Sequence, residues 1–274
     1  MINTNYPCVL TIAGTDPSGG AGIQADIKTI SATGCYAASV ITALVAQNTQ
    51  GVQAIQEINP DFILKQLESV FSDLTIHAVK IGMLHNEKVI ETVISALIKF
   101  KPEKIVLDPV MVAKNGCLLL LPDTITLLKN KLFPLVHLIT PNLFEAEQIL
   151  GERIETASDM EQAAKKIGEE CNVNVLLKGG HLNTQQSSDV LYTKDYPNDP
   201  CWFHAHRIHT KNTHGTGCTL SSAIASYLAQ NYTLNDAITA AKLYLTHAIQ
   251  SGVSLQIGRG AGPVHHFYFM ENLK

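Results

Sequence analysis

The sequence predicts an α/β protein with a central, mostly parallel sheet and helices on both of its faces. Short apolar runs alternate with amphipathic stretches along the chain, and residues of unusual chemistry fall where the apolar runs stop. Strand and helix alternation requires crossover connections, which make neighbouring strands parallel. The 274 residues, 46% of them hydrophobic, can bury a large core, and we expect one domain over residues 1–274.

Six apolar runs have the composition of buried parallel strands. They span residues 8–14, 39–46, 77–82, 104–110, 137–140 and 174–180. Two further runs, 189–193 and 201–209, predict a hairpin around the polar segment 194–200.

Stretches with apolar residues three and four apart predict helices between these strands. They span residues 25–33, 61–73, 86–100 and 158–171, and two long helices at roughly 217–229 and 234–251 close the fold. Asn86 and Ser158 are the expected caps of the helices that they begin, because their side chains can accept from free backbone N–H groups.

Charge and composition exclude several classes of partner. The net charge of -4 provides no basic field for nucleic acid. The N-terminus has no positively charged lead, and no apolar run approaches the ~18 residues of a membrane span. We therefore expect a cytoplasmic protein with a small-molecule partner and no membrane contact.

Cysteines and histidines could signal metal binding or disulfides. The six cysteines, with no CxxC pair among them, favour reduced thiols that mostly pack in the core. They are Cys8, Cys35, Cys117, Cys171, Cys201 and Cys218. In HAHRIH, alternation places His204 and His206 on one face of a strand, but no Cys or carboxylate of ligand spacing accompanies them. A surface strand is the favoured interpretation.

Residues of unusual chemistry gather at the predicted strand ends. In a doubly wound sheet, ligands bind outside the carboxyl ends of the strands, so these positions would line one cleft. Each residue could alone be a turn or a cap, but their coincidence indicates a site. They are Gly14, Gln47 with Asn48, Gly82 with Met83, Asp108, Asn142 and Gly179.

Two glycine-rich segments look like anion sites. Residues 14–19 have the glycine spacing of a P-loop, but Gly20 and Ala21 stand where Lys and then Ser or Thr are required. Gly215 and Gly217 directly precede a small-residue helix, whose free N–H groups and dipole can bind a phosphate. A plain helix cap by a neighbouring threonine, Thr213 or Thr216, is the alternative.

These motifs together resemble the hydroxymethylpyrimidine and hydroxymethylpyrimidine-phosphate kinases of thiamine biosynthesis, in the ribokinase-like superfamily. The resemblance runs from about residue 8 to residue 268. It rests on AGTDPSGGAGIQADIKT, ITALVAQNTQGV, KIGML, LDPVM, ITPNLFEAE, LLKGGH, TKNTHGTGC and GPVHHF. It implies a three-layer α/β fold without a large separate lid domain, ATP and Mg²⁺ as co-substrates, and a homodimer.

The resemblance assigns the first glycine-rich segment to the organic acceptor, so that no lysine is needed there. Gln47 would hydrogen-bond the ring, because a carboxamide offers a donor and an acceptor side by side, as an aminopyrimidine edge does. The remaining pocket residues would be Gly14, Ala21, Asp26, Met83 and Val110, the last two as apolar contacts.

The resemblance also implies the phosphate side of the site. Asp108 and Glu145 would hold Mg²⁺ partly through water, and Lys178 and Asn142 would contact ATP. Without the resemblance, a first-turn glutamate is a cap and a strand-end lysine is solvated. The backbone of Gly215, Thr216 and Gly217 would bind the migrating phosphoryl group. Cys218 would take the acceptor's proton, because a helix N-terminus favours the thiolate.

Two other functions fit the same residues. A pyridoxal or pyridoxine kinase would act on a similar heteroaromatic ring that carries a hydroxymethyl group. A non-catalytic ligand-binding protein could also be built on this scaffold, although the intact glycines and carboxylates argue against it.

Overall fold

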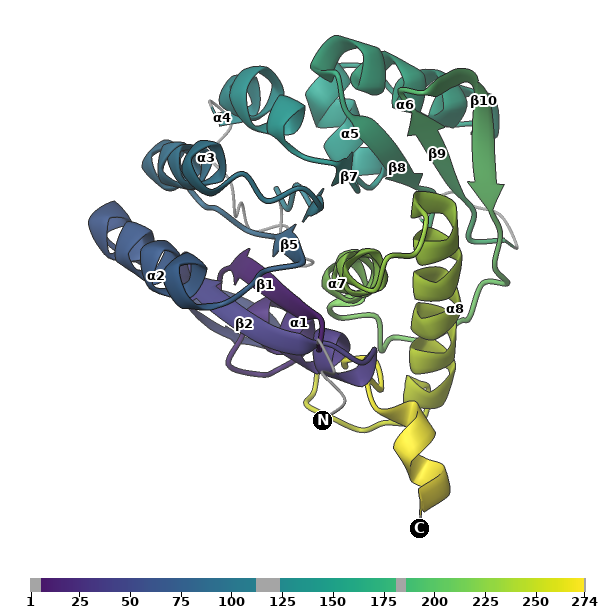
Figure 1. The fold of residues 1–274 in the computed structure, drawn as a ribbon. Coiled ribbons are helices and arrows are strands. Elements are labelled where there is room, and N and C mark those ends of the chain that lie inside the picture. Colours follow the sequence, from purple (N-terminus) through teal and green to yellow (C-terminus); the bar gives the residue numbers. More distant parts are fainter. Residues whose placement is uncertain (1–5, 112–123, 181–185, 274) are drawn as a thin grey trace, which may run out of the picture.

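Eight of the described strands form one sheet in the order β10-β9-β8-β7-β6-β5-β1-β2 (Figure 1). The computed structural model describes residues 6–111, 124–180 and 186–273. The strands from β2 to β8 in this order pair in parallel, and β9 and β10 are antiparallel. Their bounds are β1 Cys8–Ala13, β2 Tyr36–Ile41, β5 Ala78–Ile81, β6 Ile105–Leu107, β7 Leu138–Ile139, β8 Asn174–Lys178, β9 Asp189–Thr193 and β10 Tyr196–Phe203.

Helices cover both faces of this sheet (Figure 1). One face packs against α1 (Gly22–Ala32), α7 (Thr216–Ala229) and α8 (Leu234–Gly252). The other face packs mainly against α2 (Pro60–Asp73), α3 (Glu87–Phe100), α5 (Leu143–Leu150) and α6 (Ala157–Cys171). Successive strand residues serve opposite cores, as Val9 and Leu10 do on β1, because side chains alternate across a strand. The short elements are α4 (Thr124–Leu127), η1 (Leu128–Leu132), η2 (Phe133–Leu135) and η3 (Tyr268–Leu273).

The prediction of one strand over residues 39–46 is wrong. The chain leaves the sheet at Thr42, whose hydroxyl donates to the carbonyl of Met83 at 2.7 Å. Residues beyond it form β3 (Ala43–Asn48), which pairs antiparallel with β4 (Gly51–Glu57). Gln47 and Asn48 therefore lie at the end of β3 in a separate hairpin, and not at the end of a strand of the main sheet.

The second hairpin also differs from its prediction. β10 begins at Tyr196 and ends at Phe203, so that only residues 194 and 195 form the turn. Beyond Phe203 the chain is no longer a strand, and His206 makes one isolated bridge to Gln186. His204 and His206 are therefore not neighbours on one face of a strand.

Among the described residues, no group of three or more His, Cys, Asp or Glu side chains could hold a metal ion.

The predicted caps have different outcomes. The Asn86 side chain accepts from the N–H of Val89 at 3.0 Å, which confirms its role. Ser158 does not cap its helix, because α6 begins at Ala157 and the Thr156 side chain accepts from the N–H of Asp159.

The five described cysteines are all free. Cys8, Cys35 and Cys171 are buried, and Cys201 and Cys218 are half-buried. Cys117 lies outside the described residues. None of the helices that the structure describes is long and apolar enough to span a membrane.

A fully buried ion pair joins four elements beneath the carboxyl edge of the sheet. Lys80 on β5 places Nζ 2.8 Å from both carboxylate oxygens of Asp26 on α1. Asp26 also accepts hydrogen bonds from the hydroxyls of Thr11 and Ser222, which lie on β1 and α7. Although burial lowers the pKa of Lys80, the nearby Asp26 carboxylate raises it above its ordinary value. The charges are thus stable only as a pair.

We predict that Lys80→Met lowers the free energy of unfolding by about 3–5 kcal/mol, because it leaves the Asp26 carboxylate buried without a countercharge. Urea denaturation measures this loss. Lys99→Met is the matched control, since Lys99 pairs with Glu68 on the surface, where both side chains are about half exposed. The control should cost no more than about 1 kcal/mol. Equal losses for the two variants would contradict the structural role of the buried pair.

Candidate active site

Three predicted site residues from distant parts of the chain meet at the carboxyl edge of the sheet. Lys178, the last residue of β8, places Nζ 2.8 Å from Oδ1 of Asp108, which follows β6. A Cβ atom built on Gly217 would lie 3.1 Å from Oδ2 of Asp108 and 3.4 Å from Nζ of Lys178. The start of α7 therefore lies directly against this ion pair.

The second glycine turn (residues 215–218) presents backbone donors. Gly215 caps α7 with a φ of 78° and has no side chain to bond the free N–H groups of the helix. The predicted alternative of a Thr216 cap is wrong, because Thr216 lies within α7 and donates its hydroxyl to the Thr213 carbonyl. The Thr213 cap stays a prediction. Helix geometry leaves the first N–H groups of α7 without intrahelical acceptors. They are available to an anion, and the helix dipole favours one there.

Glu145 combines a cap with an unusual electrostatic setting. Its N–H donates to Asn142 Oδ1 at 3.0 Å, and its carboxylate accepts from the Asn142 N–H at 2.8 Å. The side chain is 4% exposed, and burial raises its pKa to about 7, with Lys178 opposing and Asp108 adding to this rise. Two carboxylates that repel each other fit a divalent cation, and Mg²⁺ usually takes one or two protein carboxylates and keeps several waters.

The expectation of a favoured Cys218 thiolate is wrong in this structure. Cys218 lies in the first turn of α7, but burial raises the pKa of its thiol to about 11. Lys80 and the Gly22 N–H oppose this rise, whereas Asp26 and Asp108 add to it. The prediction considered the helix dipole alone. The cost of desolvating the thiolate, to which the charges of Asp26 and Asp108 add, exceeds that effect.

The predicted acceptor residues divide into two groups. Gly14, Met83 and Val110 come together: a Cβ atom on Gly14 would lie 3.3 Å from the sulfur of Met83, and Val110 packs against the Met83 cluster. The hairpin β3–β4 covers them through Ala43 and Val45. Asp26 is not part of this apolar cluster: it is fully buried, and both of its carboxylate oxygens are bound by Lys80.

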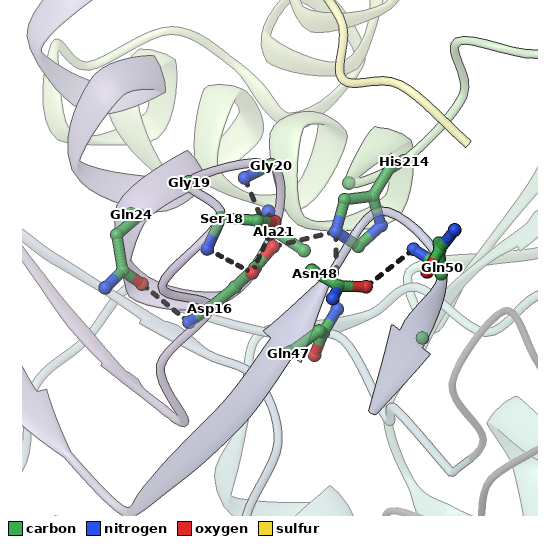
Figure 2. Close-up of polar contacts among 12 residues, drawn as sticks. Asp16, Ser18, Gly19, Gly20, Ala21, Gln24, Gln47, Asn48, Gln50 and His214 are labelled. Carbon is green, nitrogen blue, oxygen red and sulfur yellow. Dashed lines mark hydrogen bonds and ion pairs between the residues drawn. The ribbon is translucent and has the colours of Figure 1, made fainter. Parts of the chain in front are cut away.

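The first glycine loop (residues 14–22) binds a carboxylate of its own. Asp16 is 1% exposed, and it accepts from the backbone N–H groups of Ser18, Gly20 and Ala21 and from the Ser18 hydroxyl (Figure 2). Burial raises the pKa of Asp16, but hydrogen bonds from His214 and Ser18 outweigh burial and lower it below its ordinary value. The amides that would hold a phosphate in a P-loop are therefore occupied.

Sequence reasoning missed three residues of this region, Asp16, Lys80 and His214. An aspartate two residues before the serine of a glycine-rich turn indicates a side chain that accepts from its own loop. A lysine within an apolar strand run indicates a buried partner. His214 gave no comparable signal, because its partner Asp16 is 198 residues away in the chain.

A separate groove of about 710 Å³ lies at the opposite edge of the sheet, near the starts of β6, β7 and β8. None of the predicted site residues lines it. Ligands of doubly wound sheets bind at the carboxyl edge, so the groove is not the candidate active site. Its lining includes Lys104, His137, Asn174, Trp202 and Tyr232.

Solved structures that resemble this fold include kinases of small molecules. Pyridoxal kinase from Bacillus subtilis in complex with ADP has a TM-score of 0.88 and 36% identity, over 96% of this chain and 98% of that one. Phosphomethylpyrimidine kinase from Clostridium difficile has a TM-score of 0.78 and 45% identity, over 88% and 99% of the two chains. The fold and these similarities thus define a ribokinase-like small-molecule kinase.

The sequence comparisons narrow this class to one family. A family model described as phosphomethylpyrimidine kinase matches residues 16–265, and the chain belongs to this family. The hydroxymethylpyrimidine/phosphomethylpyrimidine kinase of Escherichia coli is 50% identical over 261 residues, 94% of this chain and 97% of that protein. The protein of the same name from Rhizobium meliloti is 46% identical over 260 residues, 94% and 96% of the two chains.

We predict that Gly215→Ala disrupts the site, because the added Cβ would lie 1.8 Å from the carbonyl oxygen of Gly20. Gly151→Ala is the matched control: Gly151 has a similar φ of 72°, but nothing lies within 4 Å of its Cβ position. Gly151→Ala should lose about 1–2 kcal/mol of stability through backbone strain. Gly215→Ala should lose more, because its Cβ would also clash with the backbone of Gly20. Gly215→Ala alone should also lose about 100-fold in kcat/KM, since small displacements of reacting groups are costly. Equal activity of the two variants would contradict the tight loop contact.

The raised pKa of Cys218 predicts slow alkylation at neutral pH. The rate with iodoacetamide should rise about tenfold per pH unit beyond pH 9, because only the thiolate reacts. Mass spectrometry of the peptide that contains Cys218 follows the reaction. A short unstructured cysteine peptide, with an ordinary pKa of about 8.5, is the control and should level off near that pH. A plateau for Cys218 below pH 8 would show that the thiolate is favoured after all.

Proposed function

We propose that the protein transfers the γ-phosphoryl group of ATP to 4-amino-5-hydroxymethyl-2-methylpyrimidine, and then phosphorylates the monophosphate to the pyrophosphate, in thiamine biosynthesis. One observation carries this proposal beyond family membership. The second glycine turn, which is suited to a phosphoryl group, lies against the first glycine loop at Gly20, and Gly14 of that loop contacts Met83. A hydroxymethyl group on a ring that binds against Met83 would be next to the phosphoryl group.

The acceptor ring would bind beneath the β3–β4 hairpin. Met83 and Val110 offer an apolar surface, and Gly14 leaves room because it has no side chain. Gln47 on β3 would hydrogen-bond the polar edge of the ring. Ala21 would border the ring through the first glycine loop. Asp26 would support the pocket from below, since its carboxylate is engaged by Lys80.

ATP would bind with its γ-phosphoryl group over the N–H groups of Thr216, Gly217 and Cys218. Lys178 would leave Asp108 to contact the phosphates as a mobile point charge, and Asn142 would border the nucleotide. Asp108 and Glu145 would hold Mg²⁺, which supplies charge neutralisation for the phosphates. These fixed donors would stabilise charge in the transition state.

The transfer would be direct. The acceptor oxygen attacks the γ-phosphorus, the bond from phosphorus to the bridging oxygen of ADP breaks, and the hydroxyl proton leaves toward Cys218. Since the thiol is already protonated at neutral pH, Cys218 can accept the hydroxyl proton only in the minor fraction of molecules in which it is a thiolate. Transition states of phosphoryl transfer are loose in most analyses, so charge stabilisation by the amides and Lys178 contributes more than proton removal.

Several broader features belong to the same proposal. We expect residues 1–274 to act as one kinase domain, a homodimer to form as the family resemblance implies, and the enzyme to work in the cytoplasm, where ATP is available.

A pyridoxal kinase is the second candidate. It is favoured by structural similarity to pyridoxal kinases, including that of Staphylococcus aureus in complex with AMP-PCP and pyridoxal, at a TM-score of 0.87 and 31% identity. Sequence identity reaches 50% with a pyrimidine kinase, which supports the first candidate. A non-catalytic binding protein would not need the Asp108, Glu145 and Lys178 arrangement.

Steady-state kinetics on the purified protein with ATP and Mg²⁺ test the proposal. We expect kcat/KM for the hydroxymethylpyrimidine to exceed that for pyridoxal by at least about tenfold, the equivalent of one well-placed hydrogen bond. ADP release without an acceptor is the control for ATP hydrolysis. A clear preference for pyridoxal would overturn the pyrimidine assignment, and no acceptor-stimulated ADP release would support a non-catalytic protein.

A further inference from the structure

Asp16 and Gln47 approach the same nitrogen of His214. Nε2 of His214 lies 2.7 Å from Oδ2 of Asp16, and the amide nitrogen of Gln47 lies 3.3 Å from that same Nε2 (Figure 2). The three residues come from the first glycine loop, the hairpin β3–β4 and the segment before α7. They are therefore where the acceptor side and the phosphate side of the candidate site meet.

The imidazole is held firmly in this position. A Cβ atom on Gly20 would lie 2.3 Å from Cδ2 of His214, so the ring occupies space that only a glycine leaves open. The backbone N–H of His214 donates to the carbonyl of Gly262 at 3.0 Å. The side chain is 10% exposed. Rotation of this ring away from Asp16 would require both loops to move.

The chemistry of Asp16 decides which hydrogen bonds His214 makes. Backbone and hydroxyl donors surround the Asp16 carboxylate, so it is ionised and can only accept. Nε2 of His214 must therefore carry a hydrogen and donate it to Asp16, whether the imidazole is neutral or charged. No lone pair remains on Nε2 to accept from the amide of Gln47.

Two donors thus face each other when the amide nitrogen of Gln47 points at His214. A rotation of the carboxamide by 180° places its oxygen there instead, and that oxygen can share the N–H of His214. The orientation of an amide is decided by such a network of donors and acceptors. The NH₂ group of Gln47 then lies on the side away from His214, as a donor.

We propose that His214 is a positioning residue that sets the orientation of the Gln47 carboxamide, so that Gln47 donates to a ring nitrogen of the heteroaromatic acceptor. This inference rests on the proposed function, since it concerns how the same pocket binds its ring. The second lone pair of the amide oxygen stays available to an exocyclic amino group next to that nitrogen. His214 thereby determines the orientation of the ring's donor and acceptor edge relative to Gln47.

A double-mutant cycle tests the proposal. The dissociation constant of the hydroxymethylpyrimidine is measured by calorimetry, without ATP, for wild type, Gln47→Ala, His214→Asn and the double variant. Asn places its amide near the position of Nδ1 and is too short for Asp16, whereas Gln reaches the position of Nε2, so His214→Gln is the matched control. Thermal unfolding verifies that each variant is folded, and His214→Leu replaces His214→Asn if the latter does not fold.

We expect Gln47→Ala and His214→Asn each to weaken pyrimidine binding about tenfold, and the double variant to be no weaker than either, because His214 acts through Gln47. His214→Gln should stay within about threefold of wild type, and ATP binding should be similarly unaffected in all four. Wild-type affinity in His214→Asn, or losses that multiply to about 100-fold in the double variant, would overturn the positioning role. Wild-type protein that binds no pyrimidine would overturn the proposed function itself.

Discussion

The contact between the first glycine loop and the start of α7 is the constraint on which the site depends. Gly215 adopts a left-handed φ of 78°, and its Cα lies so close to Gly20 that no side chain fits between them. The 2.7 Å hydrogen bond between Nε2 of His214 and Oδ2 of Asp16 joins the same two segments. Although these segments are far apart in the sequence, this interlock of two contacts fixes the position of the first glycine loop relative to the N–H groups at the start of α7.

Support for the interlock comes from below and from above. Below it, the buried pair of Lys80 and Asp26 ties α1 to the sheet, and Ser222 extends this network to α7. Above it, Ala261 donates its N–H to the carbonyl of Thr49 at the tip of the β3–β4 hairpin, and Gly262 accepts from the N–H of His214. The C-terminal segment therefore connects the β3–β4 hairpin with the segment that leads into the second glycine turn.

Local patterns in the sequence predicted most of the fold. Apolar runs are long enough to identify β1, β5, β6 and β8, and the long amphipathic helices follow from their spacing. The division of residues 39–46 could not be predicted, because it depends on the hydrogen bond from Thr42 to Met83, which are distant in sequence. We predicted a loop over residues 194–200 because this segment contains prolines, but an edge strand such as β10 tolerates proline.

The sequence predicted the site residues whose role follows from their own residue type. It did not predict properties that depend on the charges of neighbouring side chains. The strand-end positions of Asp108 and Lys178 brought them together as expected. The raised pKa of Cys218 depends on desolvation of its thiol and on the charges of Asp26 and Asp108, which come from other parts of the chain. The resemblance placed Asp26 in the pocket wall, but the partner that engages its carboxylate, Lys80, is 54 residues away.

A crystal structure with a non-hydrolysable ATP analogue and the hydroxymethylpyrimidine tests the central claim most directly. We expect the terminal phosphate on the N–H groups of residues 216–218, with the ring against Met83 and its hydroxyl oxygen about 3–3.5 Å from the phosphorus. Phosphates on the amides of residues 18–21, with Asp16 displaced from them, would contradict it.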